Sequence, residues 1–121
     1  MGESSLGASR RRDDVAGVKL EVLYLDGCPS NDRLLPCLRE LAIGHSVELQ
    51  RHRIDTPEQA VQTRFLGSPS VRVDGVDVEP GAQARADFGL KCRLYRGPDG
   101  QSRQPPTEWI ERALRETAAR R

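Results

Sequence analysis

The cysteines are the residues of this sequence best suited to chemistry, and one of them has an unusual context. Cys28 follows an apolar run that breaks at Asp26-Gly27, and a proline comes directly after it in Y-L-D-G-C-P-S-N-D. We predict that Cys28 is the N-cap of a helix, where free backbone N–H groups and the positive end of the helix dipole favour a thiolate. The Gly-Cys-Pro context favours an exposed, reactive thiol; the alternative is an inert buried cysteine.

The other two cysteines differ in what they could do. Cys37 lies about 13 Å along the same predicted helix from Cys28 and about half a turn round it, which exceeds disulfide reach. We interpret Cys37 as a packing residue. Cys92 follows a long loop in F-G-L-K-C-R-L-Y. It could approach Cys28 as a resolving thiol or as a second metal ligand, or it could be a core residue of a short strand.

The remaining polar residues indicate little further chemistry. Asp26 is either a turn residue or a carboxylate that could deliver a proton. His45 and His52 have no metal-ligand spacing to each other or to the cysteines, so we expect no zinc site and no cofactor. The sequence contains no Gly-rich phosphate loop, no Ser/His/Asp set and no nucleic-acid-binding motif.

Composition bounds the class of protein. The chain has 121 residues and a formal net charge of +1, from 19 basic and 18 acidic side chains. A nearly neutral surface does not recruit nucleic acid or anionic lipid. No stretch approaches the roughly 20 apolar residues that a membrane helix needs, and no secretory signal is visible, so we expect a cytoplasmic protein with reduced thiols. We predict a disordered tail over residues 1–16 and one domain over residues 17–121.

The elements that must position the cysteines are predicted by apolar periodicity and by turn residues. Pro29 suits the first helical position, Pro36 lies in the helix interior, and Gly44 is expected to end that helix. Thr56 and Gln59 predict a capping box, and Asp74-Gly75 predicts a tight hairpin. The predicted strands cover residues 18–25, 47–54, 70–73, 76–78 and 92–96, and the predicted helices begin at residues 29, 57 and 107.

Two of the predicted helices have buried faces that the sequence specifies. The helix from residue 29 is expected to bury one apolar stripe, formed by Leu34, Leu35, Leu38, Leu41 and Ala42. The helix from residue 57 is expected to bury Ala60, Val61, Arg64 and Phe65 and to end at Gly67.

The element order begins with a strand–helix–strand unit, which implies parallel pairing with a right-handed crossover. We therefore expect an α/β fold with a mixed central sheet of four or five strands and helices on both faces.

Two motifs together make the chain resemble the thioredoxin superfamily over about residues 18–120. Cys28-Pro29-Ser30-Asn31 is similar to the Cys-x-x-Cys or Cys-x-x-Ser motif that caps the first helix there, and Pro36 is similar to its kink proline. Ser68-Pro69 is similar to its cis-proline before a later strand. The resemblance implies a thioredoxin-like fold, a cis Ser68-Pro69 bond and a substrate site framed by Pro29, Ser68 and Pro69.

The chain departs from that motif at one position. Asn31 stands where the second, resolving cysteine is found, so a Cys-x-x-Cys cycle cannot run within the motif. The resemblance then implies a monothiol site in which Asn31 acts as a hydrogen-bonding group.

A narrower resemblance rests on D-G-C-P, D-T-P-E-x-A, F-L-G-S-P-S-V-R-V-D-G and F-G-L-K-C-R-L-Y. These segments are similar to small bacterial thioredoxin-like proteins that are often labelled alkylmercury lyase. This resemblance implies that Cys28 and Cys92 could bind mercury while Asp26 helps to deliver a proton.

Three functions follow as expectations. The first is redox or thiol-exchange chemistry centred on Cys28, with protein or low-molecular-weight thiols and disulfides as partners. The second is binding of mercury or another thiophilic metal, or lyase activity, through Cys28 and Cys92. The third is a non-catalytic module that holds an extended peptide beside Pro69. None of them involves nucleic acid or a membrane.

Overall fold

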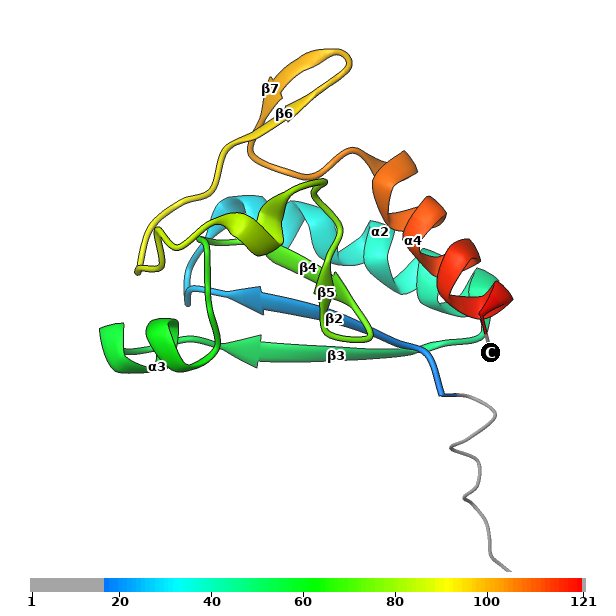
Figure 1. The fold of residues 1–121 in the computed structure, drawn as a ribbon, viewed down its shortest axis with the longest axis horizontal. Coiled ribbons are helices and arrows are strands. Elements are labelled where there is room, and N and C mark those ends of the chain that lie inside the picture. The colour runs from blue at the N-terminus through cyan, green and yellow to red at the C-terminus, as the bar shows by residue number, and fades with distance from the viewer. Residues whose placement is uncertain (1–16, 121) are drawn as a thin grey trace, which may run out of the picture.

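A computed structural model describes residues 17–120 of the protein (Figure 1). The predicted disordered tail, residues 1–16, lies outside the described part. The elements, in chain order, are β2 (Lys19–Tyr24), α2 (Pro29–His45), β3 (Glu48–Arg53), α3 (Pro57–Gln62), β4 (Ser70–Val73), β5 (Val76–Asp77), the 3₁₀ turn η2 (Ala82–Ala84), β6 (Tyr95–Gly97), β7 (Gly100–Ser102) and α4 (Thr107–Ala119).

The central sheet has four strands in the order β3-β2-β4-β5. Strand β2 pairs in parallel with β3 through the α2 crossover and antiparallel with β4, and β5 pairs antiparallel with β4. The predicted mixed α/β sheet is therefore confirmed. Strands β6 and β7 pair with each other in a separate ribbon, which projects from the body of the molecule in Figure 1.

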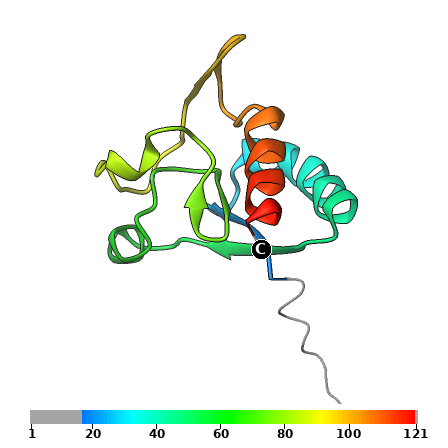
Figure 2. The same ribbon diagram turned by 45° about the vertical axis from the view of Figure 1, so that its right-hand side comes forward.

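The two faces of the sheet are covered unequally. Leu20 and Val22 of β2 point into the main core, to which α2 and α4 contribute from the same side (Figures 1 and 2). Leu23 alternates to the other face and packs with Ala60 of α3 and with Phe65. Helices thus contact both faces, with the short α3 on the second one.

Helix α2 forms as its apolar spacing predicts, but it ends later. Its buried apolar residues are Leu34, Leu35, Leu38 and Ala42. Pro29 takes the first helical position and Pro36 lies inside the helix, which continues past Gly44 to His45. The prediction that Gly44 ends the helix was wrong, because Ser46 adopts the left-handed conformation, with φ 56°, and caps α2 instead.

Helix α3 begins as predicted and ends early. The Gln59 N–H donates to the Thr56 hydroxyl at 3.1 Å, and the Gln59 side chain accepts from the Thr56 N–H at 3.2 Å, so the capping box is confirmed. The helix ends at Gln62, because Arg64 has a φ of 57°. The buried face was predicted in part wrongly: Ala60 and Phe65 are buried, but Val61 and Arg64 are exposed.

Local signals placed the β4–β5 hairpin correctly. Asp74 and Gly75 have φ values of 52° and 83°, as a type I′ turn requires at both central positions. The Lys19 N–H donates to the Asp74 carboxylate at 2.8 Å and ties the turn to the start of β2.

Candidate functional site

The turn after β2 and the segment before β4 meet at one end of the sheet, where β2 finishes and β4 begins. Leu23 pairs with Ser70 at the antiparallel junction, so the residues beyond this pair run side by side. The Leu25 N–H donates to the Ser68 hydroxyl oxygen at 3.0 Å, and the Cys28 N–H donates to the Leu25 carbonyl at 3.2 Å. The two motifs singled out in the sequence are thus joined through Leu25.

The Ser68-Pro69 segment is held firmly. Its peptide bond is cis, as the resemblance implied. The Tyr95 hydroxyl donates to the Pro69 carbonyl at 2.6 Å, and the Ser70 hydroxyl donates to the Gly67 carbonyl at 2.6 Å. Burial raises the pKa of Tyr95, so its hydroxyl stays protonated and available as a donor.

Cys28 is the N-cap of α2, as predicted, with an extended backbone (φ −75°, ψ 113°). The prediction that it is exposed was wrong, since only 8% of the residue is accessible. One contact of this turn comes from far along the chain. The Gln104 side chain donates to the Ser30 carbonyl at 3.4 Å, which brings the segment before α4 against the first turn of α2.

Asn31 is the second unusual residue of this turn. It lies three positions after Cys28, on the same side of the helix, and is 3% exposed. Within residues 17–120, its side-chain carbonyl oxygen has no hydrogen-bond partner. An unsatisfied buried acceptor costs about 1–3 kcal/mol, so this oxygen is suited to accept a hydrogen from a thiol or a ligand.

Cys92 lies beside Ser68 rather than in a strand of its own. The Ser68 N–H donates to the Lys91 carbonyl at 2.8 Å, and the Arg93 N–H donates to the Ser68 carbonyl at 3.0 Å, which makes Ser68 and Cys92 a parallel bridge pair. Paired residues share a face, so the Cys92 side chain projects to the same side as the Ser68 hydroxyl. The predicted 92–96 strand was wrong: the strand starts at Tyr95, and Cys92 is exposed, not part of a core.

Sequence reasoning missed the group that fixes the Cys92 segment. Arg93 is 1% exposed. Its guanidinium donates to both Asp77 oxygens at 2.7 and 3.0 Å, to Glu79 at 2.7 Å and to the Ser70 hydroxyl at 2.9 Å, and it lies 4.5 Å from the Tyr95 ring centroid. Burial disfavours the charged form, but the bonds to the carboxylates outweigh it and raise the pKa of Arg93. The sequence did carry one signal: Arg93 and Tyr95 are two positions apart, as are the acids Asp77 and Glu79 that bind Arg93.

Gly67 permits the close approach of this segment. Its φ is 127°, and a Cβ atom there would lie 3.0 Å from the Arg93 Cβ and 3.1 Å from the Lys91 carbonyl oxygen. Any larger residue would push the Cys92 segment away from Ser68.

The other predicted site residues are peripheral. Asp26 is exposed in the turn before Cys28, and Pro29 is exposed at the start of α2. Cys37 is half-buried, with its sulfur 3.9 Å from the Thr107 hydroxyl. His52 bonds to Glu21 at 3.1 Å. Within the described residues, no group of three or more His, Cys, Asp or Glu side chains could hold a metal ion, and no helix is long and apolar enough to cross a membrane.

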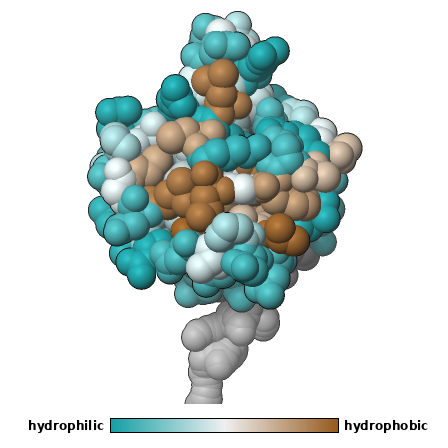
Figure 3. Space-filling view, turned by 90° about the vertical axis from the view of Figure 1, so that its left-hand side faces the viewer, coloured by the Kyte–Doolittle hydropathy of each residue, from teal (hydrophilic) through white to brown (hydrophobic). Residues whose placement is uncertain are grey.

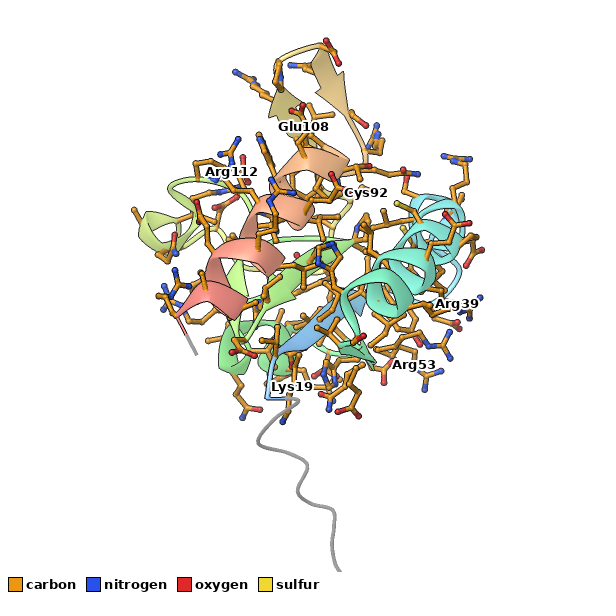
Figure 4. All side chains as sticks on the ribbon, turned by 90° about the vertical axis from the view of Figure 1, so that its right-hand side faces the viewer. Lys19, Arg39, Arg53, Cys92, Glu108 and Arg112 are labelled. Atoms are coloured by element: carbon orange, nitrogen blue, oxygen red, sulfur yellow. The ribbon has the colours of Figure 1, made fainter. Side chains whose placement is uncertain are left out.

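Apolar groups accompany the exposed cysteine. Leu90 and Leu94, two positions either side of Cys92, are 41% and 42% exposed. Figure 3 shows apolar side chains gathered on the face toward which β2 and β3 point. In Figure 4, Cys92 is labelled below the β6–β7 ribbon. The exposed Cys92 sulfur, which has exposed Leu90 and Leu94 near it in the sequence, is open to a partner that has both apolar and thiol-reactive groups.

No model of a known protein family matches the sequence, and a search of curated proteins finds no match either.

Proposed function

We propose that the chain has a thioredoxin-like fold and carries out thiol exchange centred on Cys28. The proposal rests on one observation above all, the hydrogen bond from the Leu25 N–H to the Ser68 hydroxyl. It joins the turn that carries Cys28 to the segment that carries Pro69, and these are the two motifs on which the resemblance depends.

The chemistry follows from the surroundings of Cys28. Cys28 lies at the N-terminal end of α2, where its thiol can take part in exchange with a disulfide. Asn31 supplies a hydrogen-bond acceptor in place of a second cysteine. The substrates are disulfides of proteins or of low-molecular-weight thiols, and the cytoplasm keeps such cysteines reduced.

The test is turnover of hydroxyethyl disulfide with glutathione as the reductant. Cys28→Ser is expected to turn over clearly more slowly than the wild type, because resolution then depends on external glutathione alone. Cys37→Ser is the matched control, because this cysteine lies on the same helix and contacts Thr107 instead; it is expected to keep the wild-type rate. Full turnover by Cys28→Ser would overturn the proposal.

A second candidate function is supported by the Ser68–Cys92 bridge, which brings another thiol to the same end of the sheet as Cys28. Two thiolates are suited to a soft, thiophilic metal such as mercury. We expect mercuric binding to weaken equally in Cys28→Ser and Cys92→Ser. Release of benzene from phenylmercuric acetate, sensitive to Asp26→Asn, would indicate lyase activity; binding that is indifferent to Cys92 would exclude the two-cysteine site.

A further inference from the structure

Two cysteines are linked to Ser68, Cys92 directly and Cys28 through Leu25, and they differ in their access to solvent. Cys28 is buried at the cap of α2, whereas Cys92 is exposed at the bridge. Reaction of a thiol with an external reagent depends on access as well as on thiolate character. A disulfide that arrives from solvent therefore meets the sulfur of Cys92 first.

Cys92 is exposed and yet held in place. Its two neighbours bond to Ser68 through the backbone, and the buried Arg93 joins the segment to Asp77 and Glu79. An attacking thiol gains from such positioning, because less motion must be lost when the reacting atoms meet.

The surroundings of Cys28 are looser. The bonds that hold its turn are long for their type, at 3.2 Å from its own N–H and 3.4 Å from Gln104 to Ser30. The unsatisfied oxygen of Asn31 gains a partner if this turn opens. Two of the bonds that hold the Cys28 turn are thus longer than those that hold Cys92, so this turn is the one that we expect to move toward a reacting neighbour.

We propose that Cys92 attacks the substrate first and that Cys28 is the resolving thiol. This inference rests on the proposed thiol exchange and reverses the order that the Cys-Pro motif predicts. It also supplies the second thiol that Asn31 cannot provide, because Cys92 pairs with Cys28 in place of a second cysteine within the helix.

The proposed exchange has two steps, one at each cysteine. The Cys92 thiolate attacks one sulfur of an external disulfide; the S–S bond breaks, and the first thiolate leaves and takes up the proton that Cys92 had lost. The Cys28 thiolate then attacks the Cys92 sulfur, and the second thiolate leaves and takes up the proton from Cys28. The substrate gains two electrons, and the protein holds a Cys28–Cys92 disulfide. Two molecules of an external thiol reduce that disulfide and are themselves oxidised to a disulfide.

The test uses the aromatic disulfide DTNB, which releases one coloured thiolate at each step, with Cys37→Ser as the parent protein. The parent is expected to release about two equivalents per chain and to end without a bound aromatic group. Cys28→Ala is expected to release about one equivalent and to keep the other group on Cys92, as peptide mass spectrometry would show. Cys92→Ser is expected to release the first equivalent about tenfold more slowly than the parent.

Each other outcome is decisive. If Cys92→Ser releases the first equivalent at the parent rate, or if the trapped group is found on Cys28, the proposed order is wrong while thiol exchange stands. If the parent ends with an aromatic group on each cysteine and forms no internal disulfide, both the order and the pairing are wrong. Circular dichroism confirms folding, and Cys28→Ser replaces Cys28→Ala if the alanine variant unfolds.

Discussion

The two sides of Ser68 are built in opposite ways. On one side, Cys92 is exposed, but its segment is fixed by a fully buried arginine with four hydrogen bonds to Asp77, Glu79 and Ser70. On the other side, Cys28 is buried, but two of the hydrogen bonds that hold its turn are 3.2 and 3.4 Å long. Exposure and rigidity occur together on the Cys92 side, and burial and looseness on the Cys28 side.

This difference separates the two tasks of a thiol pair. A thiol that meets substrate from solvent needs access and a fixed direction, and the resolving thiol needs protection until its partner has reacted. Substitutions in the Cys92 segment and in the Cys28 turn can test this difference.

The largest effect should follow from breaking the Arg93 group. Arg93→Met leaves the carboxylates of Asp77 and Glu79 without their buried partner, so we expect a loss of about 3–5 kcal/mol in the free energy of unfolding. Arg85→Met is the matched control, because Arg85 is more exposed in its pairs with Asp87 and Glu79 and should cost less than about 1 kcal/mol. Urea unfolding measures both, and equal losses would mean that the Cys92 side is not specially fixed.

A smaller effect should follow at the Pro69 carbonyl. Tyr95→Phe removes the hydroxyl that donates to this buried oxygen, and we expect a cost of about 1–3 kcal/mol in unfolding free energy. Tyr24→Phe is the control, since the Tyr24 hydroxyl makes no hydrogen bond within residues 17–120. If the two variants are equally stable, the bond to Pro69 contributes nothing to this side.

On the Cys28 side, a substitution should change the solvent access of the Cys28 thiol more than the stability of the protein. Gln104→Ala removes the donor to the Ser30 carbonyl. A bond worth about 1 kcal/mol corresponds to about a fivefold change in the opening equilibrium, so alkylation of Cys28 by iodoacetamide should accelerate by that factor. Alkylation of Cys92 should stay unchanged.

The control for this experiment is Gln101→Ala, which alters the exposed strand β7 and should leave the alkylation rate of Cys28 as it is. An unchanged rate in Gln104→Ala would show that another segment covers Cys28.

The smallest effect concerns the outer charges of the Cys92 side. Hydrogen bonds from Arg85 and Lys91 hold the pKa of Asp87 well below its usual range. A carboxylate with a lower pKa in the folded state stabilises the fold above its unfolded pKa, about 4, and loses that contribution as the pH falls further. Asp87→Asn should therefore cost less than about 1 kcal/mol near neutral pH and nothing in strong acid. A difference that does not depend on pH would contradict the ion pair.

Local signals were enough to predict much of the fold. The Thr56 capping box, the Asp74-Gly75 turn and the apolar stripe of α2 depend on neighbours within a few residues, and the structure has all of them. Errors at element ends have local causes too, such as Ser46 and Arg64, which adopt left-handed conformations that residues other than glycine rarely take.

The environment of the site depends on distant contacts and could not be predicted. One contact of the first turn of α2 comes from Gln104, 74 positions from its partner Ser30. Arg93 was not singled out from the sequence, because a buried arginine is recognised only when its carboxylate partners, 14 and 16 positions away, are placed around it. The place of Cys92 beside Ser68 likewise follows from a bridge between segments that no periodicity connects.

The central claim is that Cys28 and Cys92 react as a pair across Ser68. The most direct measurement is peptide mapping by mass spectrometry after mild oxidation of the Cys37→Ser protein with diamide, without reduction before digestion. The account predicts a monomer in which a peptide containing Cys28 is disulfide-linked to one containing Cys92. Recovery of Cys28 as a free thiol, with Cys92 joined only to other chains, would contradict it.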